Sequence, residues 1–268
     1  MLFSACVPAI FGGRSIAVPG SPDEKKPLTI AQALPLIRAC GGTAFEMWSW
    51  WDQDMEAVYA AKQETGLTCA ALCTPFLSLT DPAVRPAYLE GLQKTVETAK
   101  KLGCTRIISQ VGSERKDVPR EAQHASIVEG LKAAVPLLRG TDVTLAFEPL
   151  NTRVDHRGYY LWQAKEAFAI EDEVSDPQVK VLYDLYHQAV MDDLNLAEIK
   201  ENLHRIVHFH IAGHPGRHNP LRPNSLDAMA LFRAIRDMGY QGYIGLEYMP
   251  LEEPTEGLRE ILDAVKVL

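Results

Sequence analysis

Short apolar runs rich in β-branched residues alternate with longer amphipathic stretches along the whole chain, and this alternation constrains the fold more than any other feature. The stretches between the runs carry apolar residues at i, i+3 and i+4, and glycines follow several of them, as at the C-caps of helices. The apolar runs, each interpreted as a strand, occupy residues 2–9, 44–48, 67–73, 105–111, 143–149, 180–185, 206–212 and 243–249. Eight strand–helix units in 268 residues predict an α/β fold, a (β/α)8 TIM barrel, as a single domain over residues 1–268.

A doubly wound open sheet is the alternative fold for the same alternation. Such sheets usually place a glycine-rich phosphate-binding turn after the first strand. The corresponding segment here, FGGRS, lacks the G-x-G-x-x-G spacing, and the chain has no Walker lysine. The barrel is therefore preferred. The polar stretch 12–27 after its first strand is expected on the catalytic face, where it could act as a lid.

Composition excludes several classes of partner. The formal net charge is −8, whereas a nucleic-acid partner requires a basic face. No run of 18 apolar residues is present and no charged segment precedes the apolar N-terminal part, so neither a membrane span nor a signal peptide is expected. Five cysteines lie in apolar surroundings without zinc-ribbon spacing, which is typical of reduced core residues in a cytoplasmic protein. The predicted partner is a small-molecule substrate.

Polar residues at the carboxyl ends of four consecutive predicted strands indicate a metal site. The active site of such a barrel lies where its strands end. Glu148, Asp184, His210 and Glu247 stand at these positions. Glu148 taken alone could be a surface or capping residue, but three carboxylates buried close together would repel one another unless a cation compensates their charge. Three oxygen ligands and one imidazole favour Mn²⁺ or Mg²⁺, with Co²⁺ or Zn²⁺ as alternatives.

The stretch VHFHIAGHPGRH holds four of the eight histidines and one arginine. His208 precedes His210 by two residues and therefore points to the same side of the strand, either behind the metal or as a hydrogen-bonded core histidine. His214 and His218 are expected at the surface of the following loop. Arg217 is placed to bind an anionic or polyhydroxyl substrate, the alternative being a solvated loop arginine.

Two further segments supply candidate substrate contacts. His187 lies three residues after the predicted aspartate ligand and is expected in the loop above the metal, touching substrate, rather than at a helix entry. Glu46 ends the second predicted strand and is followed by Trp48, Trp50 and Trp51. This aromatic surface suits a pocket wall, a subunit contact in a homo-oligomer, or packing over the barrel mouth. Trp48 is taken as a substrate-binding residue.

Several segments resemble one known family. They are FEPLNTR (147–153), YDLYH (183–187), HFHIAGHPGRHNP (208–220) and GYIGLEYMP (242–250), and the eight-unit rhythm extends the likeness over essentially the whole chain. On these motifs the chain resembles the hydroxypyruvate isomerase branch of the xylose isomerase-like TIM barrels. The resemblance implies a divalent metal held by the four strand-end residues. It also implies that Glu148 and Glu247 act as acid–base catalysts and that His187 and Arg217 bind substrate.

Three departures from that family pattern bear on the substrate. His210 stands where hydroxypyruvate isomerases often have glutamine and the related ketose 3-epimerases have histidine. After PGRHNP the family usually has a Gly-x-Gly-acid turn, whereas this chain reads LRPNSLDA, in which Arg222 either adds positive charge near the mouth or faces solvent. The 3-epimerases carry an extra glutamate soon after the strand-5 ligand, and its absence from RVDHRG counts against a 3-epimerase.

The expected activity is an isomerisation of a small hydroxy-carbonyl compound by proton transfer through a cis-enediolate. Hydroxypyruvate to tartronate semialdehyde is the first choice. The alternatives are a sugar or ketose epimerase and an inosose-dehydratase-like lyase. An apurinic-site endonuclease would need histidines on strands 2, 3 and 4, which FEMW, AALC and ISQV lack, and a non-catalytic binder would lack one of the two glutamates.

Overall fold

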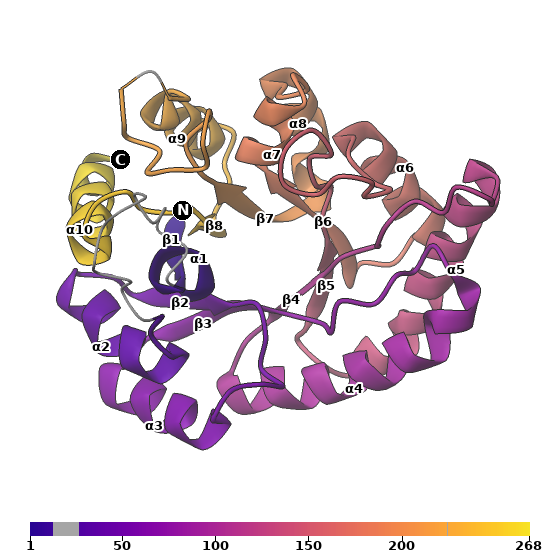
Figure 1. The fold of residues 1–268 in the computed structure, drawn as a ribbon, viewed down its shortest axis with the longest axis horizontal. Coiled ribbons are helices and arrows are strands. Elements are labelled where there is room, and N and C mark those ends of the chain that lie inside the picture. The colour runs from indigo at the N-terminus through magenta and orange to yellow at the C-terminus, as the bar shows by residue number, and fades with distance from the viewer. Residues whose placement is uncertain (13–26, 224) are drawn as a thin grey trace, which may run out of the picture. The chain divides into compact units, whose positions relative to one another are not determined.

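The structure is a computed structural model that describes residues 1–12, 27–223 and 225–268. Within them, eight strands hydrogen-bond in chain order as a closed barrel, which confirms the predicted (β/α)8 fold. Along the colour ramp of Figure 1, each strand is followed by at least one helix, from β1 at the indigo end to α10 at the yellow end. The strands are β1 (Leu2–Cys6), β2 (Ala44–Met47), β3 (Thr68–Cys73), β4 (Arg106–Ser109), β5 (Thr144–Phe147), β6 (Val179–Asp184), β7 (Ile206–Ile211) and β8 (Tyr243–Leu246).

Each stretch predicted to be helical contains a helix. The helices are α1 (Val7–Phe11), α2 (Ile30–Ala39), α3 (Met55–Thr65), α4 (Arg85–Leu102), α5 (Arg120–Leu138), α6 (Ala164–Val174), α7 (Leu185–Val190), α8 (Leu196–Asn202), α9 (Ala228–Asp237) and α10 (Pro254–Ala264), with short 3₁₀ turns η1 (Pro82–Val84), η2 (Leu203–Arg205) and η3 (Val265–Val267). Gly66 and Gly103 end α3 and α4 with φ of +67° and +62°. These left-handed values are ones that glycine adopts without steric cost, so both predicted C-caps are confirmed.

Two helices differ from the predicted pattern. The first apolar run leaves the strand at Cys6 and becomes α1, because Pro8 stands in the first helical turn, where no N–H is needed. Helix α7 begins directly after β6, and Asp184 caps it by accepting from the N–H groups of Tyr186 (2.7 Å) and His187 (3.3 Å). His187 therefore lies in a helix and not in the predicted loop. The predicted lid, 12–27, falls outside the described residues from 13 to 26.

The chain divides into two compact units, each described by itself. Unit 1 comprises Met1–Trp48, Asp52–Ala70 and His210–Leu268, and unit 2 comprises Ser49–Trp51 and Ala71–Phe209. In unit 1, β1 pairs in parallel with β2 and β8, with Cys6 opposite Glu46 and Ser4 opposite Gly245. In unit 2, β4 pairs in parallel with β3 and β5, and β5 with β6. Each unit thus brings the carboxyl ends of its own parallel strands to one edge.

The strand interiors and the cysteines form a buried core. Strand β2 is buried at every residue, and β3 at every residue after the first, as parallel strands covered by helices require. All five cysteines are buried and none forms a disulfide, as predicted for reduced core residues. Among the described residues, no helix combines the length and the apolar character needed to cross a membrane.

Candidate active site

Glu247, the residue directly after β8, is buried and surrounded by side chains of unit 1. Trp48 Nε1 donates to Glu247 Oε1 at 2.7 Å, and Arg217 Nη2 donates to Oε2. The Cys6 thiol approaches Oε1 at 4.0 Å, and His210 Nδ1 lies 3.7 Å from Oε2. Trp48 and Arg217, both predicted to bind substrate, therefore contact a predicted catalytic carboxylate directly.

Charge keeps the Glu247 carboxyl group ionised. Burial raises its pKa, but the Arg217 guanidinium, His210 and the Trp48 indole oppose that effect and hold the pKa below its ordinary value. At neutral pH Glu247 is therefore a buried anion. A metal ligand or a proton acceptor requires that charge state.

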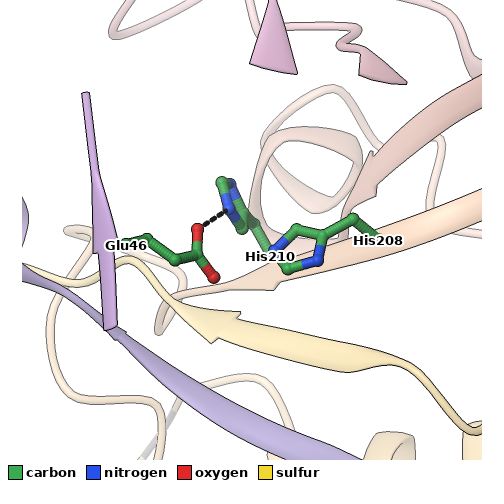
Figure 2. Close-up of side chains that lie close together, drawn as sticks. All are labelled: Glu46, His208 and His210. Carbon is green, nitrogen blue, oxygen red and sulfur yellow. Dashed lines mark hydrogen bonds and ion pairs between the residues drawn. The ribbon is translucent and has the colours of Figure 1, made fainter. Parts of the chain in front are cut away.

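His210 on β7 is fixed by a second carboxylate. Figure 2 shows Glu46 on β2 facing the His210 ring, and the two are joined by a 2.8 Å bond between His210 Nε2 and Glu46 Oε2. Ser4 donates to the other oxygen of Glu46. Because an ionised carboxylate only accepts, His210 Nε2 donates this bond, and His210 Nδ1 lies on the side of Glu247. His208, two residues earlier on β7, is fully buried.

Gly245 on β8 makes room for the Glu46–His210 pair. A Cβ at this position would lie 2.4 Å from Glu46 Oε1 and 2.5 Å from His210 Cδ2, far inside van der Waals contact. We expect Gly245→Ala to displace the pair and lower the free energy of unfolding by about 1–3 kcal/mol, measured by denaturant titration. In a Glu46→Ala background the same substitution should cost less, since one clashing group is gone. An equal cost in both backgrounds would contradict this explanation.

Backbone hydrogen bonds hold the loop that carries Arg217. The N–H of Gly213 donates to the carbonyl of His218, and the N–H of Met249 donates to the carbonyl of Arg217, both at 2.7 Å. Arg217 has a φ of +58°, in the left-handed region that non-glycine residues rarely adopt. The loop is thus tied to the segment that follows β8. His214 and His218, which were expected at the surface, are half-buried.

In unit 2, the predicted ligands Glu148 and Asp184 are buried at the ends of neighbouring strands. Glu148 follows β5, and its carbonyl accepts from the Tyr159 hydroxyl at 3.2 Å. Asp184 ends β6. Glu148, Asp184 and His187 each offer a ligand atom within 4.8 Å of the others. Sequence analysis did not single out Tyr159, because the irregular segment after β5 carries no periodic signal.

His187 is fully buried on α7 and is bound on two sides. Its Nε2 lies 3.4 Å from Asp184 Oδ2, and its Nδ1 lies 2.6 Å from Asn151 Nδ2. The His156 ring packs edge-on against it, with 5.2 Å between ring centroids. Sequence analysis assigned no role to Asn151, although its place in FEPLNTR, three residues after Glu148, is a usable signal.

The donors in each unit suit a hard divalent cation. Unit 2 offers the carboxylates of Glu148 and Asp184, and unit 1 offers the carboxylate of Glu247 with His210 Nδ1 at 3.7 Å. Carboxylate oxygens and a single imidazole are ligands that Mg²⁺ and Mn²⁺ accept. The residues therefore fit a divalent cation, as the sequence predicts.

Two other predicted features have structural explanations. Arg222 is paired with Glu252 at 2.7 Å and Glu260 at 2.9 Å, so its charge is neutralised locally. In unit 2, Trp50 Nε1 donates to Thr95 Oγ1 at 3.1 Å, and Trp51 packs edge-on against an exposed phenylalanine. Both of these tryptophans are thus engaged in packing, whereas the Trp48 indole contacts a predicted site residue.

Comparison with known proteins identifies the family. The sequence profile described as Xylose isomerase-like TIM barrel matches residues 34–266. The chain belongs to the xylose isomerase-like TIM barrel family. A curated relative in this family, the putative hydroxypyruvate isomerase of Homo sapiens, is 32% identical over 238 residues, which cover 83% of this chain and 86% of the relative. The 2-oxo-tetronate isomerase of Cupriavidus necator is 33% identical over 175 residues, which cover 65% of this chain and 66% of the relative.

A solved structure supports the same fold. The structure described as AP endonuclease, family 2, from Brucella melitensis matches with a TM-score of 0.87 over 98% of both chains, at 22% identity. Identity at that level shows a shared fold alone. The relatives place this xylose isomerase-like chain in the hydroxypyruvate isomerase-like branch, and it is an isomerase.

Proposed function

We propose that this isomerase acts on a small 2-oxo acid with a hydroxyl group beside the carbonyl, and that it interconverts hydroxypyruvate and tartronate semialdehyde. The observation that carries the proposal is the setting of Glu247, which is buried, ionised and held by Trp48 and Arg217. The names of the relatives, putative hydroxypyruvate isomerase and 2-oxo-tetronate isomerase, support the same substrate class.

Glu148 and Glu247 are the proposed acid–base pair. One glutamate removes a proton from C3 of hydroxypyruvate, which gives an enediolate across C2 and C3, and the other returns a proton to C2. The hydroxyl proton moves from the oxygen on C3 to the oxygen on C2, so no atom is gained or lost. Both carboxylates are buried, and the exclusion of water protects the reactive intermediate.

Three side chains are proposed to bind the substrate. The Arg217 guanidinium, which donates to Glu247, supplies positive charge for a substrate carboxylate. His187, beside Glu148 and Asp184, supplies a donor for a substrate oxygen. The Trp48 indole, fixed by its bond to Glu247, supplies an apolar wall.

Glu148, Asp184, His210 and Glu247 are proposed to hold one divalent cation, Mn²⁺ or Mg²⁺. Such a cation would supply positive charge that stabilises the negative charge developing on the substrate oxygens. Glu46 contributes by holding the His210 ring so that its Nδ1 lies on the side of Glu247. A carboxylate behind a ligating histidine is a common means of fixing such a ring.

Incubation with hydroxypyruvate in D₂O tests the proposed reaction. We expect the product, tartronate semialdehyde, to carry solvent deuterium on C2, because the carbon-bound proton passes through an exchangeable carboxyl group. Proton NMR and mass spectrometry detect this deuterium. A four-carbon 2-oxo acid with a C3 hydroxyl tests the chain length. Turnover of a ketohexose with deuterium at C3, or loss of water from an inosose, without turnover of either oxo acid would overturn the proposal.

A further inference from the structure

The orientation of the Asn151 amide is determined by its neighbours in unit 2. Asn151 is fully buried, and its Oδ1 accepts from the backbone N–H groups of Val154 and Asp155, both at 3.0 Å. Its Nδ2 lies 2.6 Å from Asp155 Oδ2. Turning the amide over would place its oxygen against a carboxylate and its NH₂ group against two N–H donors. The NH₂ group therefore faces Asp155.

The second hydrogen of that NH₂ group faces His187. Asn151 Nδ2 lies 2.6 Å from His187 Nδ1 as well as from Asp155 Oδ2, and an amide has two N–H donors for these two acceptors. His187 Nδ1 must then accept. A neutral imidazole has one acceptor and one donor nitrogen, so the ring proton lies on Nε2, which is 3.4 Å from Asp184 Oδ2.

We propose that Asn151 is a positioning residue that holds His187 in its Nε2–H tautomer, so that the ring presents a hydrogen-bond donor instead of a lone pair. The residues around His187 hold the ring in place as well as setting which nitrogen carries the proton. Tyr186 donates its hydroxyl to Asp155 Oδ2 at 2.8 Å, and Asp184 Oδ1 accepts from the His187 N–H. The Asn151–Asp155 pair is thereby anchored to the same helix that carries the ring.

In this tautomer His187 is not available as a metal ligand. A metal ligand needs a nitrogen lone pair, and in His187 that lone pair is on Nδ1 and accepts from Asn151. His210 also donates through Nε2, but it donates to Glu46, and its Nδ1 lies on the side of Glu247. Resting on the proposed function, the inference assigns His187 to an oxygen of the substrate, either a carboxylate or the carbonyl of a 2-oxo acid.

The tautomer can be measured directly in protein labelled with ¹⁵N-histidine and freed of metal. Long-range ¹H–¹⁵N correlation spectra distinguish protonated from unprotonated ring nitrogens, and His187→Gln identifies the His187 signals by their loss. We expect the proton on Nε2. A proton on Nδ1, or on both nitrogens at neutral pH, would overturn the inference.

The double variant Asn151→Asp/Asp155→Asn tests the role of Asn151. It keeps the net charge and the side-chain shapes, but it replaces the donor to His187 with an acceptor. We expect the proton to move to Nδ1 and KM to rise about 10- to 100-fold, with a smaller change in kcat, because a hydrogen bond to a charged group is lost. A folded double variant that kept the Nε2–H tautomer would refute the role of Asn151.

Asn195→Asp is the matched control. Asn195 also accepts from two backbone N–H groups through Oδ1, at the start of α8, and the change should leave the His187 signals and KM unaltered. The spectra are recorded without substrate. A protein with the expected tautomer that turns over no 2-oxo acid would therefore refute the proposed function and leave the tautomer standing.

Discussion

Glu247→Gln is expected to lower kcat by about 10²- to 10⁴-fold while the barrel remains folded. Gln keeps the shape of the side chain, but its single carbonyl oxygen can accept from only one of Trp48 and Arg217, which donate to different oxygens of Glu247. Gln also cannot take up a proton from carbon. Because the Arg217 guanidinium loses its buried counter-ion, we also expect some loss of stability. Steady-state kinetics and thermal unfolding measure the two effects separately.

Glu148→Gln should give a loss of similar size, because the proposed reaction needs a carboxyl group on each side of the enediolate. Glu64→Gln, an exposed glutamate on α3, is the matched control and should leave kcat unchanged. A folded Glu247→Gln protein that retained full turnover would remove Glu247 from the acid–base pair. If unfolding alone explained the fall in kcat, the fraction of folded protein would fall by the same factor.

Strand ends were predictable because the barrel repeats a local pattern. Each apolar run ends where a polar residue interrupts it, and parallel strands bring those interruptions to one edge. Glu148 and Asp184 were therefore placed correctly at the ends of β5 and β6 from spacing alone. The same reasoning located Glu247 directly after β8.

The partners of these residues were not predictable in the same way. The bond between Glu46 and His210 joins positions 164 apart in the chain, and no local periodicity encodes such a pair. His187 was expected in a loop because it lies three residues after Asp184, the end of the predicted strand. An aspartate at the end of a strand can also cap a helix, and Asp184 does both. That dual role, a signal available in the sequence, explains the error.

Removal of divalent cations is expected to abolish turnover, with a loss of about 100-fold or more, and added Mn²⁺ or Mg²⁺ should restore it. The physical reason is that the proposed ligand set includes three buried carboxylates, whose mutual repulsion a divalent cation would offset. Activity after exhaustive chelation, with metal absent by elemental analysis, would contradict the metal assignment.

Binding of the cation can be measured without turnover. A ligand that binds only the folded state stabilises it by about 2.7 kcal/mol at a concentration of 100 Kd, so Mn²⁺ should raise the unfolding temperature of the metal-free protein. Asp184→Asn should largely remove this rise, because Asn keeps the Oδ1 that caps α7 but loses the charge. Asp54→Asn makes the same change at the cap of α3, where Asp54 accepts from Ala57 N–H, and should leave the rise intact. If the Asp184→Asn protein kept the full rise, Asp184 would not be a ligand.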